Sequence, residues 1–164
     1  MKRYKFLLTL IFVTFVLLLS ACDTTETEET NGSLYIKFIN DSTSVVTITS
    51  LMTQPMGVAG EANSEPTGDW SGDQLKSDQK VAPGEHIFLT LKIRNTEWVR
   101  IRLGVDDGSG REILLHEQPN YQESDISITH WGSDERTFSI EISKNIGNGN
   151  YYVSGWMDMA GIEG

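Results

Sequence analysis

From residue 34 onward, apolar and polar side chains alternate with a period of two, which is the pattern of β-strands that bury one face. The alternation is clearest in 34–39, 87–93 and 99–105. Residues 45–52 are rich in β-branched side chains and are predicted to form the strand that pairs with 34–39. The first half of the chain is therefore predicted to be a series of antiparallel strands.

Turn residues separate a second group of shorter strands. Gly108 and Gly110 make a tight connection into a strand at 111–115, which predicts a hairpin. Three further strands are predicted at 126–129, 137–143 and 151–156, and the last two are joined by a Gly/Asn-rich turn. About eight short strands without helical periodicity predict an all-β fold, namely an antiparallel β-sandwich of the immunoglobulin-like or jelly-roll-like kind.

Residues 53–80 interrupt the strand pattern with a long polar stretch that contains four glycines and two prolines. Loops of this length are uncommon in compact domains and often have a functional role. Trp70 and Leu75 are predicted to be the points at which this loop is attached to the domain.

The N-terminus has a different pattern, with a basic start (Met1 to Lys5) followed by an uncharged apolar run at 6–19. That run rises about 21 Å as a helix, which is short of the roughly 30 Å hydrocarbon core of a bilayer. Directly after it comes Leu19-Ser20-Ala21-Cys22, and Cys22 is the only cysteine in the chain. This arrangement resembles the signal sequence of bacterial lipoproteins.

The resemblance implies that the chain is cut between Ala21 and Cys22, that Cys22 receives a diacylglyceryl group, and that its new amino group is acylated, for example by palmitate. The protein would then be anchored at the extracytoplasmic face of a cell membrane, because two or more acyl chains make attachment stable. Asp23 resembles the enterobacterial signal for retention in the inner membrane. A plain secretory signal and an uncleaved membrane anchor are the alternatives.

Three segments follow from these patterns: a signal peptide at 1–21, the lipidated cysteine with a Thr/Glu-rich tether at 22–33, and a single β-domain at 34–164. The tether has no apolar side chain after Cys22 until Leu34, so it is predicted to be disordered.

The net charge excludes one class of partner. The formal charge is −10, and removal of residues 1–21, which contain three basic and no acidic residues, makes it −13. Such a surface repels nucleic acid and anionic headgroups. The membrane is therefore expected to be reached only through the lipid on Cys22.

A second resemblance covers residues 34–115. An ordered series of turns and core positions carries it: Asn40 with Ile48-Thr49-Ser50-Leu51, Trp70 with Leu75, Pro83-Gly84-Glu85, and 100–108 ending in Asp-Asp-Gly. This series is similar to a small β-domain that recurs in uncharacterised bacterial lipoproteins and exported proteins. The resemblance implies a fold and no activity, and the insert before Trp70 and the tail after residue 120 depart from it.

Aromatic and basic side chains supply the candidate ligand contacts. Trp98 is expected to be the most exposed aromatic, because it shares a strand face with Arg100 and Arg102; Trp131 is the second candidate and Trp70 the third. Exposed aromatic rings stack on sugars and mark protein interfaces. The alternative is that these rings fill or cover the core.

Metal and catalytic signals are weak. Asp106, Asp107 and Glu112 resemble a calcium loop, but their spacing departs from that of an EF-hand, and a hairpin turn is the preferred interpretation. The three histidines are His86, His116 and His130; they match no zinc motif, and the last two are predicted to be surface residues.

The sequence therefore predicts a lipid-anchored envelope protein that serves as a binding or structural module for a protein or glycan ligand, with no cofactor. The alternative is an envelope enzyme, a glycan- or peptide-directed hydrolase that uses surface carboxylates.

Overall fold

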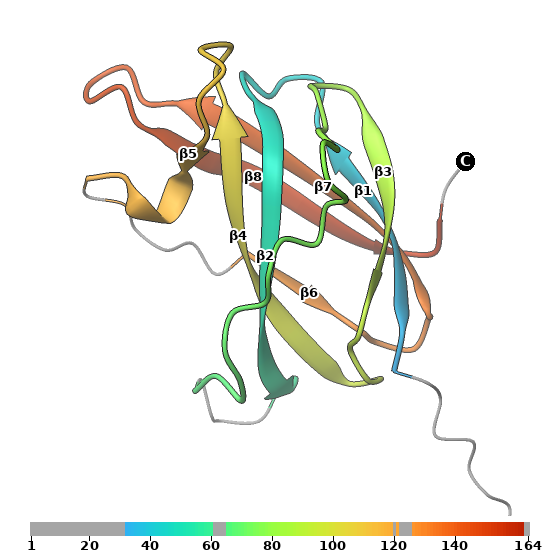
Figure 1. The fold of residues 1–164 in the computed structure, drawn as a ribbon. Helices are drawn as coiled ribbons and strands as arrows, with labels where there is room; N and C mark the ends of the chain where they lie inside the picture. Colours follow the sequence, from blue (N-terminus) through green and yellow to red (C-terminus); the bar gives the residue numbers. More distant parts are fainter. Residues whose placement is uncertain (1–31, 61–64, 120, 122–125, 163–164) are drawn as a thin grey trace, which may run out of the picture.

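The computed structural model describes residues 32–60, 65–119, 121 and 126–162, which form a two-layered β-sandwich (Figure 1). The predicted signal peptide, Cys22 and nearly all of the tether lie outside the described residues. The described elements are β1 (Leu34–Asn40), β2 (Thr47–Val58), β3 (His86–Leu91), β4 (Glu97–Asp106), β5 (Ile113–Leu114), the 3-10 helix η1 (Leu115–Glu117), β6 (Ser127–Thr129), β7 (Glu135–Lys144) and β8 (Tyr151–Ala160).

Two sheets make up the sandwich. Sheet A has the strand order β3-β1-β7-β8, and sheet B has the order β2-β4-β5, with β6 also paired to β4. The predicted all-β sandwich is thus correct. One pair departs from the antiparallel expectation, since β1 and β7 run parallel. They can do so because six other elements separate them along the chain, so no tight turn has to join them.

The core lies between the inner faces of the two sheets, where the alternating apolar residues of the sequence point. Phe38 of β1 and Phe138 of β7 are fully buried, and their rings stack with centroids 5.8 Å apart. Around them lie other side chains with no measurable exposure: Leu34, Ile36, Ile48, Leu51, Val81, Val105, Ile128, Ile140 and Ile142. No disulfide stabilises this core, because the chain has a single cysteine, Cys22.

The predicted pairing of 45–52 with 34–39 is wrong, because β2 lies in the opposite sheet and pairs with β4. After β1 the chain first follows β7, with Asp41 N–H donating to Ile140 O (2.8 Å) and Val45 N–H to Ile142 O (2.9 Å). It then crosses to sheet B. The short polar connection resembled a hairpin turn in the sequence, but its backbone groups are satisfied by β7 instead.

Strand β2 also continues to Val58, whereas it was predicted to end at Met52. This longer strand contains Pro55, and proline cannot donate a ladder hydrogen bond. In the structure, Pro55 O accepts from a residue of the following segment, on the side of β2 that faces away from β4. The missing N–H of Pro55 therefore falls on the strand edge, where it costs no bond to β4.

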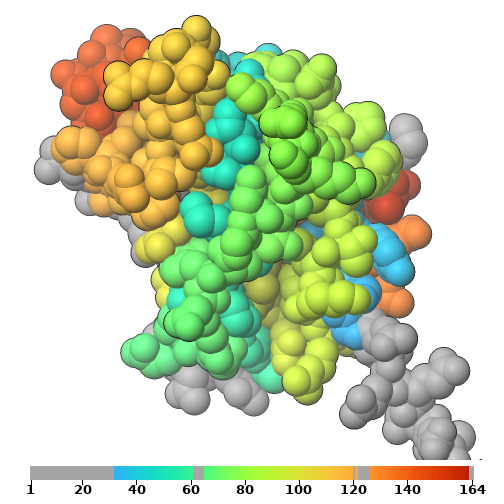
Figure 2. All heavy atoms as spheres, viewed as in Figure 1, coloured from blue at the N-terminus to red at the C-terminus, as the bar shows by residue number. Residues whose placement is uncertain are grey.

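Residues 65–81 are not a free polar loop but lie along that outer edge of β2. Main-chain N–H groups of Thr67, Ser71 and Gln74 donate to β2 carbonyls at 2.8–2.9 Å. Two side chains accept in the other direction: Ser71 Oγ from Thr53 N–H (2.9 Å) and Asp73 Oδ1 from Leu51 N–H (2.8 Å). In Figure 2 the green atoms of this segment run over the teal atoms of β2. The segment protects an edge that would otherwise offer unpaired backbone groups.

The remaining strands match their predictions, with β7 and β8 longer than expected. The β4–β5 hairpin pairs Gly104 with Leu114 and Val105 with Ile113, as the turn residues indicated. Leu75 is buried, as predicted for an attachment point of the 65–81 segment. Within the described part of the chain, no helix is both long and apolar enough to cross a membrane.

Two phenylalanines test where the core lies. Phe38→Ala removes a fully buried ring, so the free energy of unfolding should fall by about 3–5 kcal/mol. Phe88→Ala removes a ring that is 63% exposed on β3, and the change should stay within about 0.5 kcal/mol. Urea unfolding measures both variants, and equal losses would contradict the two-layer arrangement.

Candidate functional site

The outer face of sheet B brings together four of the five predicted contact residues. Along β4, Val99, Ile101 and Leu103 are buried against sheet A. The intervening Trp98, Arg100 and Arg102 therefore share the opposite face, and each is partly exposed. We call these three residues, together with Trp70, the β4 strip.

Trp70 joins the strip from the 65–81 segment. The Arg102 guanidinium carbon lies 4.0 Å from the centroid of the Trp70 ring, which is a cation–π contact. Such a contact stabilises by about 0.5–2 kcal/mol, depending on how far it is desolvated. It also places a cation and a large apolar ring side by side on one surface.

Arg100 is oriented by β2. Its Nε donates to Met56 Sδ at 3.0 Å, and Met56 is almost fully buried. Gln54 lies directly opposite Arg100 in the ladder, and its Nε2 donates to Gly68 O (3.1 Å) of the covering segment. The Arg100 side chain thus reaches across to β2, whose neighbouring Gln54 is bonded to the segment that carries Trp70.

Trp131 lies at the Trp98 end of β4. Trp98 pairs with Thr129 of β6, and Gly132 N–H donates to Asn95 Oδ1 (3.0 Å) in the turn before β4. Trp131 stands between these two attachment points and is 63% exposed. Trp98 is only partly exposed, so of the two rings it is Trp131 that extends further into solvent.

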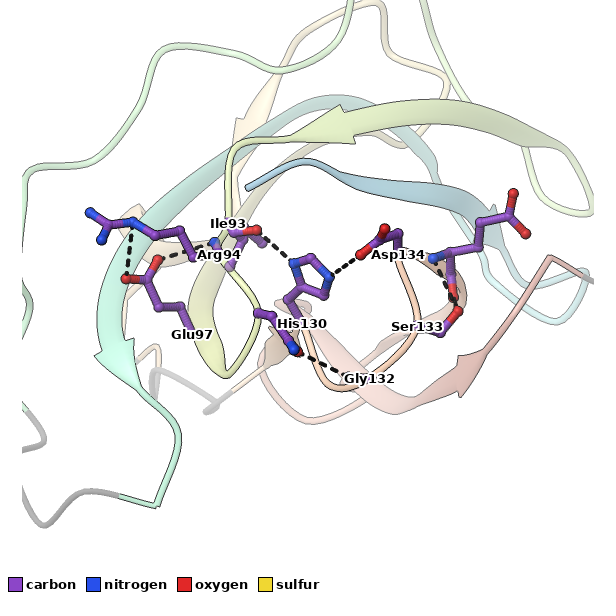
Figure 3. Close-up of polar contacts among 9 residues, drawn as sticks. Ile93, Arg94, Glu97, His130, Gly132, Ser133 and Asp134 are labelled. Atoms are coloured by element: carbon purple, nitrogen blue, oxygen red, sulfur yellow. Dashed lines mark hydrogen bonds and ion pairs between the residues drawn. The ribbon is translucent and has the colours of Figure 1, made fainter. Parts of the chain in front are cut away.

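His130 is buried, contrary to the prediction that it is a surface residue; only 1% of it is exposed. The chain passes between the sheets at this point, so both ring nitrogens lie inside the protein. Nδ1 is 2.7 Å from Ile93 O and Nε2 is 2.9 Å from Asp134 Oδ1 (Figure 3). A backbone carbonyl can only accept, so Nδ1 is the donor to Ile93 O, and the Asp134 carboxyl group holds the other side of the ring.

The His130–Asp134 pair resembles two members of a catalytic triad, but its geometry serves structure. Both ring nitrogens are already bonded, which leaves neither free to take a proton from a nucleophile. The neighbouring Ser133 hydroxyl donates to Glu135 O (3.0 Å) and not to the ring. The pair ties the end of β3 to the β6–β7 connection.

A Ser/Lys pair with the spacing of a nucleophile motif lies on the exposed surface. Ser77 and Lys80 are three residues apart, which is the Ser-x-x-Lys spacing of one class of serine nucleophile. Both are exposed, and Lys80 Nζ is paired with Asp106 Oδ2 at 3.7 Å. Because Lys80 is paired with Asp106, this spacing is not evidence of an activated nucleophile.

The predicted weak calcium ligands accept hydrogen bonds from other groups of the protein. Asp106 Oδ1 accepts from Gly108 N–H (2.9 Å) and Gly110 N–H (3.0 Å). Glu112 Oε1 accepts from Thr49 Oγ1 (2.9 Å) on β2. In the ranges that the structure describes, no group of three or more His, Cys, Asp or Glu side chains could hold a metal ion.

Asp107 closes the β4–β5 turn onto the other sheet. Its Oδ2 accepts from the Tyr151 hydroxyl (2.8 Å) at the start of β8. Hydrogen bonds from Ser109 and then from Tyr151 lower the pKa of Asp107 below its ordinary value. The carboxylate thus links two hairpins instead of facing a ligand.

An open hollow of about 180 Å³ lies on the outer face of sheet A, and no pattern in the sequence predicted it. It is lined by Asp41, Ser139, Glu141, Gly155, Trp156 and Met157. Asp41 and Glu141, which come from distant segments of the chain, both line it. Hydrogen bonds from the Thr43 backbone and hydroxyl lower the pKa of Asp41, which favours its ionised form.

Exposed apolar side chains on sheet A were also missed. Phe88 is 63% exposed, Tyr35 51% and Met157 51%. The signal was present for Phe88, because it occupies the polar phase of an otherwise regular alternation between His86 and Thr90. An aromatic residue at an outward position of a strand predicts an exposed ring.

The chain matches no protein-family model, no curated protein and no solved structure. The resemblance of residues 34–115 to a recurrent β-domain of exported proteins therefore stays a prediction.

The bond between Tyr151 and Asp107 predicts a pH effect. Because the pKa of Asp107 is lowered in the folded state, its contribution to stability is present above the ordinary carboxyl pKa and is lost as pH falls through the folded-state pKa. In Tyr151→Phe the Asp107 pKa should rise toward its ordinary value. NMR titration of the carboxyl carbon measures this, with Tyr152→Phe as the matched control; an unchanged Asp107 titration in Tyr151→Phe would remove the Tyr151 hydroxyl as a cause.

Proposed function

We propose that this protein is a lipid-anchored lipoprotein of the bacterial cell envelope, and that its β-sandwich is a binding module for a protein or glycan ligand. The Leu-Ser-Ala-Cys motif at 19–22, which resembles the signal of bacterial lipoproteins, supports the anchor. The lipid on Cys22 would hold the domain at the extracytoplasmic face of the membrane, with Asp23 as the candidate signal for retention in the inner membrane.

The observation that carries the binding role is the β4 strip. Trp98, Arg100 and Arg102 occupy alternate outward positions of one strand, and Trp70 stacks on Arg102 from a separate segment. A rigid strand fixes the spacing of these groups, which lowers the entropy lost on binding. The strip therefore has the composition of an interaction surface, in which Trp and Arg contribute most of the affinity.

The chemistry of the strip defines the ligand. The indole rings offer apolar faces to a sugar ring or an aromatic side chain. The guanidinium groups are matched by carboxylate, phosphate or sulfate. Since the whole chain is acidic, two arginines on one strand form a local cationic site. The ligand expected here is a sugar acid or an acidic peptide that presents a flat apolar surface beside its charge.

Binding can be measured with the full chain in detergent micelles. A uronic-acid oligosaccharide, a neutral oligosaccharide of equal length and an acidic peptide are the probes. Trp98→Ala and Arg100→Gln should each weaken binding of the preferred acidic probe about tenfold, which corresponds to about 1.4 kcal/mol. Phe88→Ala removes an exposed ring from the opposite sheet and serves as the matched control. Equal affinity of wild type, Trp98→Ala and Arg100→Gln would refute the proposal that the β4 strip binds the ligand.

The hydrolase alternative rests on the hollow of sheet A. Asp41 and Glu141 both line it, and a pair of carboxyl groups is what a glycosidase requires. The ionised form of Asp41 suits a base or a nucleophile and not a proton donor, so the acid would have to be Glu141. Cleavage of any of the three probes by wild type, lost in Glu141→Gln, would favour the enzyme over the binding module.

The anchor has its own test, the intact mass of the chain extracted from membranes. Wild type should begin at residue 22 and carry the added mass of a diacylglyceryl group and an acyl chain. Cys22→Ser should lack that mass, because no thiol remains to be modified. An unmodified wild-type chain would contradict the anchor and leave secretion or an uncleaved helix as the explanation.

A further inference from the structure

The outer edge of β8 offers unpaired backbone groups among the described residues. Gly161 N–H donates to Glu135 O (2.7 Å), which fixes the phase of the β7–β8 ladder. Hydrogen-bonded pairs alternate with non-hydrogen-bonded pairs in an antiparallel ladder. The N–H and C=O groups of Trp156, Asp158 and Ala160 therefore point away from β7, and β8 is the last strand of sheet A.

Other parts of the strand edges are covered. The outer edge of β2 is bonded to the 65–81 segment. At the start of β8, the side chain of Gln118 bonds to both backbone groups of Tyr151, accepting from N–H and donating to C=O at 2.8 Å each. A bulge then shifts the β7–β8 register between Glu141 and Ile142. Beyond it, residues 155–160 form a regular stretch whose edge no described residue covers.

Large apolar side chains accompany this edge. Trp156 stacks on Phe138 on the inner face of sheet A, with centroids 5.7 Å apart, yet remains 45% exposed. Met157 points to the outer face and is 51% exposed. A long edge strand with exposed apolar side chains is a template for pairing with another strand.

The charges on β8 point to what covers it. Asp158 is the only charged residue between Tyr151 and Ala160, and its carboxylate is bonded to Arg136 Nε at 2.6 Å. Two copies of a chain with a net charge of −10 repel each other over most of their surfaces. At the β8 edge the charge is compensated within each copy, so two copies can approach there.

We propose that the free edge of β8 binds a second copy of this chain through an antiparallel β8–β8 ladder. The contact is symmetric, so the same strand serves on both sides and a closed dimer results. The four strands of sheet A would join the four strands of the partner in one continuous sheet. This surface is separate from the β4 strip, which lies on sheet B. The proposed dimer and the proposed ligand binding can therefore be tested independently of each other.

The side chains select a register centred on Met157. In that register Trp156 lies opposite the partner's Asp158, and Met157 lies opposite itself. A register centred on Asp158 would place two carboxylates directly opposite each other, which is unfavourable. The Met157 pair is of the non-hydrogen-bonded type, in which the two Cα atoms are about 4.5 Å apart.

Disulfide cross-linking tests the register, because a Cα separation of this size suits a disulfide. In full-length chain solubilised in detergent, Met157→Cys should form a covalent dimer on mild oxidation. Met159→Cys is the matched control: it lies on the same face of the same strand, but its partner would be Gly155. Wild type controls for Cys22. Cross-linking that is stronger at 159 than at 157, or absent from both, would overturn the proposal.

Light scattering of the same preparation tests the dimer itself. Wild type should have the protein mass of a dimer. Met157→Lys places like charges opposite each other and should raise the dissociation constant at least about tenfold, whereas Met159→Lys should leave it within about threefold. Thermal unfolding of the two lysine variants shows that both are folded. A monomeric wild type, or equal dimerisation of Met157→Lys and wild type, would overturn the proposal.

Discussion

The buried side-chain amide of Asn40 holds the two sheets in the arrangement on which the rest of the structure depends. It lies at the end of β1 in sheet A, is fully buried, and donates to Val46 O and Val81 O at 2.9 Å each. Those two carbonyls mark where the chain enters β2 and where the 65–81 segment ends. One side chain thus joins the first strand of sheet A to both boundaries of the sheet B edge, and removing its donors would leave two buried carbonyls unpaired.

The two sheets differ in how their edges are treated, and this difference separates the two proposed surfaces. The edge of β2 is covered by the 65–81 segment, whose polar side chains form hydrogen bonds with the β2 backbone. The same segment carries Trp70, which contacts Arg102. The edge of β8 has no such cover among the described residues. A covered edge builds a side-chain surface for a ligand, whereas an open edge presents main-chain groups to another strand.

Side-chain chemistry at the candidate site was partly visible in the sequence. The alternation of β4 predicted that Trp98 shares a face with Arg100 and Arg102, because strand periodicity is a local property. The Trp70–Arg102 contact joins residues 32 positions apart and depends on how the covering segment lies on β2. The prediction that His130 is a surface residue was wrong for a similar reason. Its burial follows from the crossing of the chain between the two sheets, which the neighbouring residues do not predict.

By itself the sequence determined the all-β class, most strand positions and the acidic charge, because each depends on composition or on residues near one another in the chain. Only the tertiary structure decided that β2 belongs to sheet B, that β1 and β7 run parallel, and that Pro55 lies within a strand. These outcomes depend on which distant backbone groups satisfy one another. Local patterns predict which face of a strand is buried, but they do not predict which strand pairs with it.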